Sequence, residues 1–174
     1  ISTVGSKVSF LALPLVATVT LQATPLQMGY LSAIGSLPGL LLGLFAGVWI
    51  DREKRRPLLI AADIGRGLLL LVIPLAAYFG FLNMPLLYGV IFLTGTLGLL
   101  FSISSYLPSL VPRAQLVEAN SKLAVSSSAA EIAGPTLGGW LVQTLSAPIA
   151  MGFDAISFLL SALCLGLIGK PEPV

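Results

Sequence analysis

The sequence has 174 residues, of which 56% are hydrophobic and only 9% are charged, and its mean hydropathy is +1.00. A soluble domain carries about 25% charged residues, so this composition excludes the soluble classes and predicts an all-α integral membrane protein. The net charge is only +2, histidine is absent, and the single cysteine cannot form an internal disulfide. We therefore expect no metal site, no cofactor, no nucleic-acid partner and no enzymatic activity.

Six apolar segments are long enough to cross a bilayer core, which requires roughly 20 residues each. The predicted transmembrane helices lie near residues 1–22, 26–50, 58–80, 85–107, 120–146 and 148–169. The first segment has no initiator Met and no cleavage site follows it, so a removed signal peptide fits badly. We expect residues 1–174 to form one bundle in a fragment that lacks the start of the first helix.

The charged residues outside the apolar segments gather on one side of the predicted bundle. Six of the sixteen formal charges lie in the segment 51–56, between the second and third helices. Seven cations lie on this side, and the turns near 23–25, 80–85 and 146–148 carry no charge. By the positive-inside rule, we expect the N-terminus and the loops 51–57 and 108–122 to be cytoplasmic, in a multi-pass protein of a bacterial inner (plasma) membrane.

Four charged residues inside the apolar segments are candidates for binding protons or substrate: Asp63, Arg66, Glu131 and Asp154. A charge at membrane depth costs roughly 2.5–3.5 kcal/mol on insertion scales, so such residues usually face a cavity or a partner. Asp63 and Arg66 are three residues apart on one helix face and can neutralise each other. The alternative for these two residues is a pair near the cytoplasmic interface that only orients the third helix.

The sequence also contains a weak internal repeat. At an offset of 91 positions several of the rarer residue types coincide, including the only two tryptophans. The matched pairs are Gly43 with Gly134, Gly47 with Gly138, Trp49 with Trp140, Pro57 with Pro148 and Asp63 with Asp154. Because the offset spans three helices, the second copy would enter the membrane from the opposite side, as a 3+3 inverted repeat. Chance coincidence is the competing explanation.

The fifth predicted helix contains glycines at Gly134 and Gly138, a spacing that lets a neighbouring backbone approach closely. Pro135 removes a helical hydrogen bond and can bend the helix. Glu131 shares the glycine face, so we expect it to point toward the packed or cavity side. It is either a hydrogen-bonded residue of a packing seam, a carboxylate that binds and releases a proton, or a contact for a cationic substrate.

Two of these segments resemble signatures of the major facilitator superfamily. The loop 2–3 signature of that family runs Gly-x-x-x-Asp-Arg-x-Gly-Arg-Arg, and the residues that match it are Gly47, Asp51, Arg52, Arg55 and Arg56. Lys54 stands where the signature has glycine. The fifth helix is similar to the antiporter motif Gly-Pro-x-x-Gly-Gly of the family's drug exporters, through Gly134, Pro135, Gly138 and Gly139.

The loop 106–113 and the segment 154–158 resemble the macrolide-efflux and enterobactin-exporter-like branch of proton antiporters. The fourth helix departs from the family by lacking its buried arginine, which raises Glu131 and Asp154 as proton candidates. The resemblance implies the N-terminal six-helix half of a twelve-helix fold that rocks against a missing C-terminal half. Residues of the loop 2–3 signature would then form ionic contacts at the cytoplasmic gate, or, alternatively, only fix topology and touch anionic lipid.

The implied function is secondary active transport, with proton-coupled export of a drug-like, macrolide or siderophore-type small molecule and a role in drug resistance. Ser2, Ser6 and Ser9 form a small polar stripe, and Phe10, Tyr30 and Phe45 are candidates for an apolar cavity wall, although all six residues are equally ordinary in helix packing. A lipid-flipping or uptake transporter of the same superfamily is the nearest alternative. A self-contained six-helix channel or membrane scaffold is the alternative from a different class.

Overall fold

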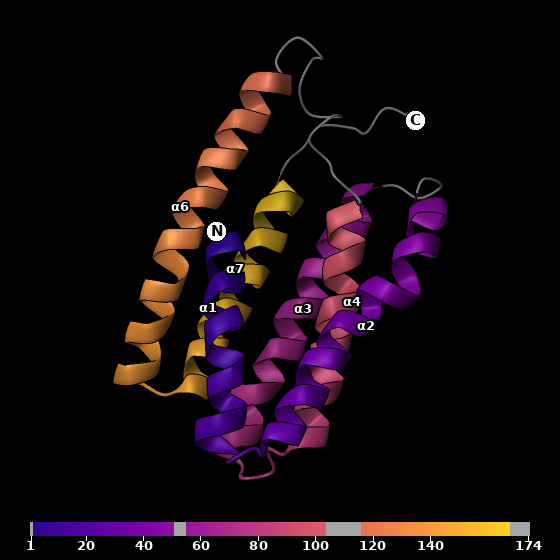
Figure 1. Ribbon diagram of the computed structural model, residues 1–174. Coiled ribbons are helices and arrows are strands. Elements are labelled where there is room, and N and C mark those ends of the chain that lie inside the picture. The colour runs from indigo at the N-terminus through magenta and orange to yellow at the C-terminus, as the bar shows by residue number, and fades with distance from the viewer. Residues whose placement is uncertain (1, 51–54, 104–115, 168–174) are drawn as a thin grey trace.

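The computed structural model describes residues 2–50, 55–103 and 116–167, and every regular element in these ranges is a helix (Figure 1). In chain order the helices are α1 (Ser2–Leu15), its π-helical continuation η1 (Val16–Thr20), α2 (Pro25–Ile50), α3 (Arg55–Tyr78), α4 (Met84–Ile103), α6 (Leu116–Thr144) and α7 (Ala147–Leu167). The all-α class that the composition predicts is therefore confirmed for the described part of the chain.

Helix starts are fixed by side chains that satisfy free backbone groups. Before α2, the Gln27 amide accepts a hydrogen bond from the Thr24 N–H at 2.9 Å, and the Thr24 hydroxyl accepts one from the Gln27 N–H at 3.3 Å. This reciprocal pair is a capping box, and Pro25 follows at the first helical position, where its missing N–H has no consequence. Asn83 caps α4 by accepting the Leu86 N–H at 2.9 Å.

The turn from α3 to α4 depends on one glycine. Gly80 adopts a positive φ of 74°, a conformation that only glycine reaches without strain. It allows the Gly80 N–H to bond to the Ala77 carbonyl and the Phe81 N–H to bond to the Ala76 carbonyl. These two bonds form a Schellman motif, which ends α3 and reverses the chain.

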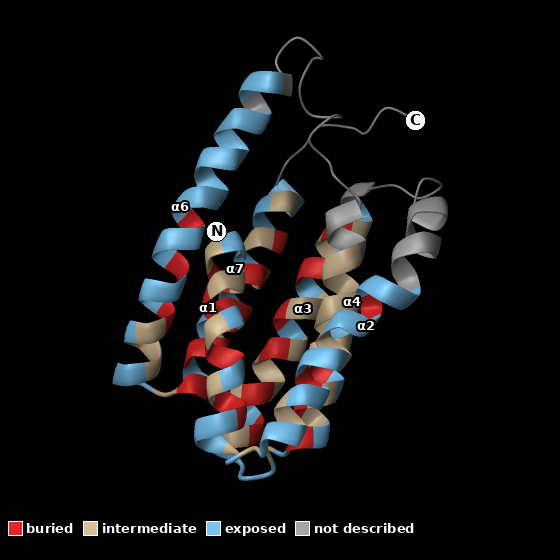
Figure 2. Cartoon of the chain, in the orientation of Figure 1, coloured by how far each residue is buried: buried red, intermediate tan, exposed pale blue. Residues whose placement is uncertain are grey.

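The helices pack as a bundle in which α3 and α7 share the most extensive contact. α1 lies against α6 and α7, and α4 lies against α2 and α3. Buried residues gather on the facing sides of α1, α3 and α7, whereas α6 is mostly exposed except for a narrow stripe that faces α1 (Figure 2). The core therefore lies between the first, third and last helices of the described chain.

Glycines bring α3 close to both of its neighbours. A Cβ atom at Gly67 would lie 2.9 Å from the Leu159 side chain and 3.1 Å from the Ala155 carbonyl oxygen on α7. A Cβ atom at Gly65 would lie 2.7 Å from the Leu97 side chain on α4. Both separations are shorter than ordinary carbon contacts, so α3 can approach its neighbours only because these positions lack a side chain.

The outward faces of the bundle are apolar. Within the described ranges, three helices are long and apolar enough to cross a membrane: Thr3–Thr20, Pro57–Tyr78 and Ala147–Leu167. Large hydrophobic side chains are exposed along these and other helices, for example Phe10, Leu68, Leu75 and Leu163. In a soluble protein so much exposed apolar surface would cause aggregation, whereas a lipid environment accommodates it.

We predict that Gly67→Val lowers the stability of the bundle by about 1–3 kcal/mol, because the added methyl groups overpack the interface between α3 and α7. Gly89→Val is the matched control, since Gly89 is also helical and a Cβ atom there meets nothing within 4 Å. Thermal unfolding in detergent measures both variants. An equal loss of stability in the two variants would contradict the close approach of α3 and α7.

Candidate functional site

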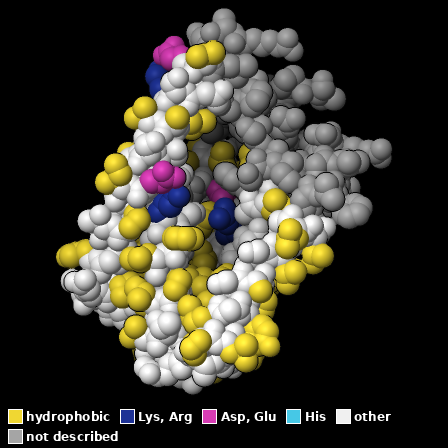
Figure 3. Space-filling view, in the orientation of Figure 1, with side chains coloured by type: hydrophobic (Ala, Val, Ile, Leu, Met, Phe, Trp, Pro, Cys, Tyr) yellow, Lys and Arg dark blue, Asp and Glu magenta, His cyan; other side chains and the backbone are white. Residues whose placement is uncertain are grey.

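A cavity of ≈ 440 Å³ lies between the helices of the bundle and opens to its surface. Its wall combines apolar side chains with a few hydroxyls and two charged residues, and it receives residues from α1, α2, α3, α4 and α7. The lining residues are Ser6, Ser9, Phe10, Leu13, Pro14, Met28, Leu31, Ser32, Gly35, Arg66, Leu70, Ile91, Thr94, Gly95, Gly98, Asp154 and Phe158. Figure 3 shows a basic and an acidic side chain together within a hollow of this face. The volume is in the range of small-molecule sites, about 300–1,000 Å³.

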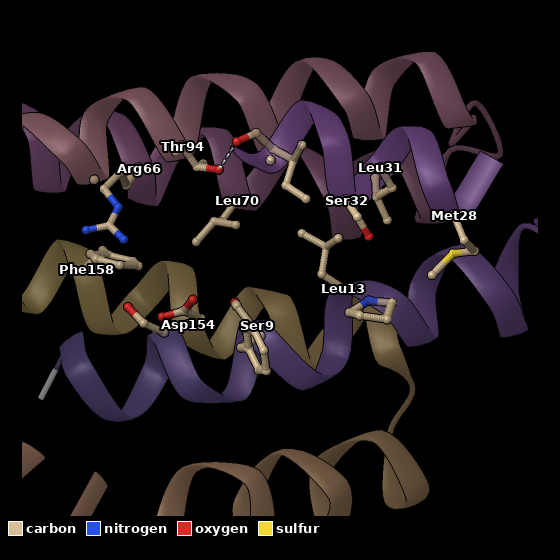
Figure 4. A pocket seen from close by; sticks show the side chains of 17 residues that line it. Ser9, Leu13, Met28, Leu31, Ser32, Arg66, Leu70, Thr94, Asp154 and Phe158 are labelled. Carbon is tan, nitrogen blue, oxygen red and sulfur yellow. Dashed lines mark hydrogen bonds between the residues drawn. The ribbon is translucent and has the colours of Figure 1, made fainter. Parts of the chain in front are cut away.

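The cavity has a polar end and an apolar end (Figure 4). Arg66, Asp154 and Ser9 lie together at one end, beside the ring of Phe158. The other end is lined mainly by apolar side chains, Leu13, Met28 and Leu31, with the Ser32 hydroxyl among them. A cavity with this division fits a molecule that has both a polar and an apolar part.

Arg66 is held by an aromatic ring and not by an acid. Its guanidinium carbon lies 4.1 Å from the centroid of the Phe158 ring on α7, which is a cation–π contact. Gly98 on α4 lies beside the guanidinium, and a Cβ atom there would make an ordinary contact with it at 3.5 Å. Among the described residues, Arg66 forms no ion pair, and its Nε has no hydrogen-bond partner.

Asp63 and Arg66 interact electrostatically, as their spacing predicts, but among the described residues they form no ion-pair contact. Asp63 is fully buried, and it lies where α3 faces α7 and not at an exposed interface. Ser161 of α7 is a polar neighbour, and Arg66 acts on Asp63 electrostatically. Neither carboxylate oxygen of Asp63, however, has a hydrogen-bond partner within the described part of the chain. The sequence spacing of three residues was sufficient for contact, but the guanidinium turns to Phe158 instead.

Asp154 is 1% exposed and lines the cavity from α7. Its Oδ1 accepts a hydrogen bond from the Ser157 hydroxyl at 3.1 Å. The Ser9 hydroxyl of α1 lies near this carboxylate and acts on it, although neither Ser9 Oγ nor Asp154 Oδ2 makes a hydrogen bond of good geometry to a described residue. Gly5 of α1 makes room for this arrangement, since a Cβ atom there would collide with the Asp154 carboxylate and the Ser157 hydroxyl.

Glu131 lies outside this cavity. Its carboxylate forms an ion pair with the Lys7 ammonium at 3.1 Å, which links α6 to α1. The two side chains are 62% and 37% exposed, so the pair lies on the surface of the described bundle. The expectation that Glu131 points to the packed side is thus only half right, because the side chain reaches α1 but remains exposed.

The glycines of the same motif do face α1. A Cβ atom at Gly134 would collide with the Lys7 side chain, and one at Gly138 would lie 3.3 Å from the Cα of Val8. Pro135 is inside α6 and is exposed, and Gly139 is half-buried, with a Cβ distance of 3.9 Å to the Leu11 side chain. Gly134 and Gly138 therefore form the seam that brings α1 and α6 together.

The structure describes only part of the loop 2–3 signature. Asp51 and Arg52 lie outside the described residues. Gly47 lies in α2, and Arg55 and Arg56 begin α3. The predicted gate role of these five residues stays a prediction from the sequence.

The sequence profile of the Major Facilitator Superfamily matches residues 1–174. The chain belongs to this superfamily. Together with the apolar helices, this membership makes it a multi-pass membrane protein.

Similar proteins come from several bacteria. The "uncharacterized MFS-type transporter YfiS" of Bacillus subtilis is 30% identical over 169 residues, which are 95% of this chain and 39% of that protein. Rv0037c of Mycobacterium tuberculosis is 37% identical over 108 residues, and y4rN of Sinorhizobium fredii is 28% identical over 151 residues; both carry the same description. The matched residues make up 24% of Rv0037c and 62% of this chain, and 37% of y4rN and 85% of this chain. No solved structure matches it significantly.

Several partners in this superfamily bundle were missed by sequence reasoning. These partners come from helices that are far apart in the sequence: Phe158 beneath Arg66, Gly5 beside Asp154 and Lys7 opposite Glu131. Ser6, Ser9 and Phe10 do line the cavity as considered, whereas Tyr30 is exposed and does not. The side chains of Ser2 and Phe45 lie outside the described part. The spacing from Asp154 to Ser157 was the one local signal that could have indicated a hydrogen bond.

We predict that Glu131→Lys destabilises the contact between α1 and α6, because it places two ammonium groups together, and that adding Lys7→Glu restores it. The expected coupling is at most about 1 kcal/mol, since the pair is exposed. Thermal unfolding in detergent measures the stability of both single variants and of the double variant. Glu118→Lys is the control, because Glu118 pairs with Lys122 within α6 at 2.7 Å. Failure of the double variant to recover stability would exclude the interhelical pair.

Proposed function

We propose that the chain is the N-terminal six-helix half of a secondary active transporter that exports a drug-like, macrolide or siderophore-type small molecule in exchange for protons. The single observation that carries this proposal is the cavity between the helices, in which Arg66 and Asp154 meet an apolar wall. A charged residue at membrane depth usually marks a substrate or ion path. A lipid-embedded scaffold would need neither the cavity nor its charges.

The pattern of helix contacts supports a 3+3 inverted repeat. If α1, α2 and α3 correspond to α4, α6 and α7, the contact of α1 with α6 corresponds to that of α4 with α2. In the same way the contact of α1 with α7 corresponds to that of α4 with α3, and the contact of α3 with α7 corresponds to itself. This two-fold pattern favours a true repeat over a chance coincidence in sequence.

Transport would proceed by alternating access, with this bundle rocking against a C-terminal six-helix half around the cavity. Asp51, Arg52, Arg55 and Arg56 would close the cytoplasmic gate by ionic contacts with that second half, with Gly47 at the helix end. The positive-inside rule supports a cytoplasmic position for the loops 51–57 and 108–122 and for the N-terminus. The bacterial relatives support a location in a bacterial plasma membrane.

Asp154 is the favoured proton carrier, and Glu131 is the alternative. Asp154 lines the cavity, so a proton bound there would act directly on the charge that a substrate meets. Glu131 is engaged with Lys7 on the surface of the bundle. Asp63 does not line the cavity, and its electrostatic contact with Arg66 gives it a supporting role.

Two other functions remain as alternatives. A lipid-flipping or uptake transporter of the same superfamily would use the same cavity, and its division into a polar and an apolar end suits a lipid. A self-contained channel or membrane scaffold is the alternative of a different class. It would function without a second bundle, whereas alternating access requires one.

We predict that Asp51→Asn reduces export by the natural full-length protein about tenfold, because it removes a gate contact. Its abundance in the membrane should not change, since the cations that determine topology remain. Efflux and surface abundance are measured in the same cells. Lys122→Gln is the control, because it removes a cation from the same side outside the signature. Normal efflux at normal abundance would count against the gate.

We predict that Asp154→Asn abolishes the dependence of transport on the proton gradient, because the proton site in the cavity is lost, while Glu131→Gln preserves it. Substrate accumulation in inverted vesicles is measured with and without a gradient. Loss of gradient dependence in Glu131→Gln alone would reassign the proton to Glu131. Unchanged dependence in both variants would argue against proton coupling through either carboxylate.

A further inference from the structure

Three buried polar atoms on three different helices line one end of the cavity without a hydrogen-bond partner in the described chain. They are the Ser9 Oγ of α1, the Arg66 Nε of α3 and the Asp154 Oδ2 of α7. Buried polar groups in folded proteins almost always have a partner, because an unpaired donor or acceptor loses its bonds to water without replacement. The Ser9 hydroxyl also acts on the Asp154 carboxylate, so the two charged groups, Arg66 and Asp154, are the ones that a ligand in the cavity would complete.

The two charges at this end of the cavity are opposite, and the structure keeps them apart. Arg66 is held over the Phe158 ring at 4.1 Å, while Asp154 is held by the Ser157 hydroxyl at 3.1 Å. They act on each other electrostatically, but they form no ion pair within the part of the chain that the structure describes. One anionic and one cationic binding group therefore face the same cavity.

Neither a simple cation nor a simple anion satisfies both groups. A cation on Asp154 would leave Arg66 without a counter-charge in the cavity, and an anion on Arg66 would leave Asp154 unpaired. Asp63 also acts on Arg66 from the same helix, but it does not line the cavity and cannot contact a ligand there. Lys7 and Glu131 neutralise each other outside it.

The rest of the cavity determines the remainder of the ligand. Away from the charged end, the wall is mainly apolar, with Leu13 from α1 and Met28 and Leu31 from α2, and the Ser32 hydroxyl lies among them (Figure 4). The Ser9 hydroxyl lies at the charged end and can donate or accept a hydrogen bond. The complementary molecule therefore has both of its charges at one end and an apolar body.

We propose that this cavity binds a zwitterionic amphiphile, with its anionic group on Arg66, its cationic group on Asp154 and its apolar body toward Leu13 and Leu31. The proposal deepens the proposed function and rests on it for the assignment of this cavity as the substrate site. A zwitterionic head of this kind occurs in amphipathic amino acids and in phospholipids that carry an ammonium and a phosphate group. Both sources share the charge pattern that the cavity recognises.

The test compares three matched probes by equilibrium binding to the purified natural full-length protein in detergent. The probes are homophenylalanine, which is zwitterionic, and its two analogues that lack one charge, phenylpropylamine and phenylbutyric acid. We expect the zwitterion to bind at least about tenfold more tightly than either analogue. Competition by lysophosphatidylethanolamine but not by lysophosphatidic acid would identify a lipid as the source of the head group; competition by neither lipid would identify a free amphipathic zwitterion.

Two variants test the assigned contacts through a change of preference that general destabilisation would not produce. Arg66→Gln should shift the preference toward phenylpropylamine, and Asp154→Asn should shift it toward phenylbutyric acid. Glu118→Gln is the control, because it removes an exposed carboxylate of α6 that does not line the cavity and should leave the preference for the zwitterion unchanged. If a variant does not fold, the ranking of the three probes on the unmodified protein still tests the proposal.

Equal or tighter binding of a singly charged probe, or no saturable binding of either zwitterion, overturns the proposal. Binding in detergent needs neither a proton gradient nor transport. A protein that binds the zwitterion but does not export would therefore contradict the proposed function alone. A protein that exports in a gradient-dependent way but prefers a singly charged probe would contradict this inference alone.

Discussion

The structure depends on how three charged residues are accommodated within an apolar bundle. Each charge at membrane depth costs roughly 2.5–3.5 kcal/mol, so Asp63, Arg66 and Asp154 could not be distributed at random over the helices. All three lie where α3 and α7 pack closely, an approach that Gly67 of α3 makes possible, and Gly5 of α1 makes room for the Asp154 carboxylate. The cavity begins where this packing ends, which explains why Arg66 and Asp154 line it and Asp63 does not.

The proposed repeat explains why Asp63 and Asp154 lie at corresponding positions. A difference between its two copies explains why the two aspartates have different neighbours. At the offset of 91 positions Asp63 corresponds to Asp154, and both are buried in the contact between α3 and α7. The residue three positions later is Arg66 in the first copy and Ser157 in the second. The serine donates a hydrogen bond to its own aspartate, whereas the arginine turns to an aromatic ring. A symmetric scaffold thereby holds an asymmetric site, with one cationic and one anionic group.

Local features of the fold could be predicted from the sequence, because they depend on neighbouring residues. The apolar lengths indicated the helices, and the Gly134 and Gly138 spacing indicated a close seam. The partners across that seam could not be predicted, since no short-range pattern connects Lys7 with Glu131 or Arg66 with Phe158. Asp63 and Arg66 interact electrostatically without an ion-pair contact, and the sequence could not show this, because the ring that holds the guanidinium is supplied by a helix from the other end of the chain.

The exposed face of α6 is more polar than the exposed faces of α3 and α7. The exposed residues of α7 are mainly apolar, such as Ile156 and Leu163, whereas α6 exposes a series of serines. Those hydroxyls donate to carbonyls of their own helix, as Ser126 does to Lys122 at 2.9 Å, so apolar surroundings cost them little.

The ion pair of Lys7 and Glu131 is different, because both of its charges remain partly exposed on this face. Lipid cannot solvate it, and the described helices do not cover it. Water or a second polar surface is needed there, which is the requirement that an alternating-access partner along α1 and α6 would meet.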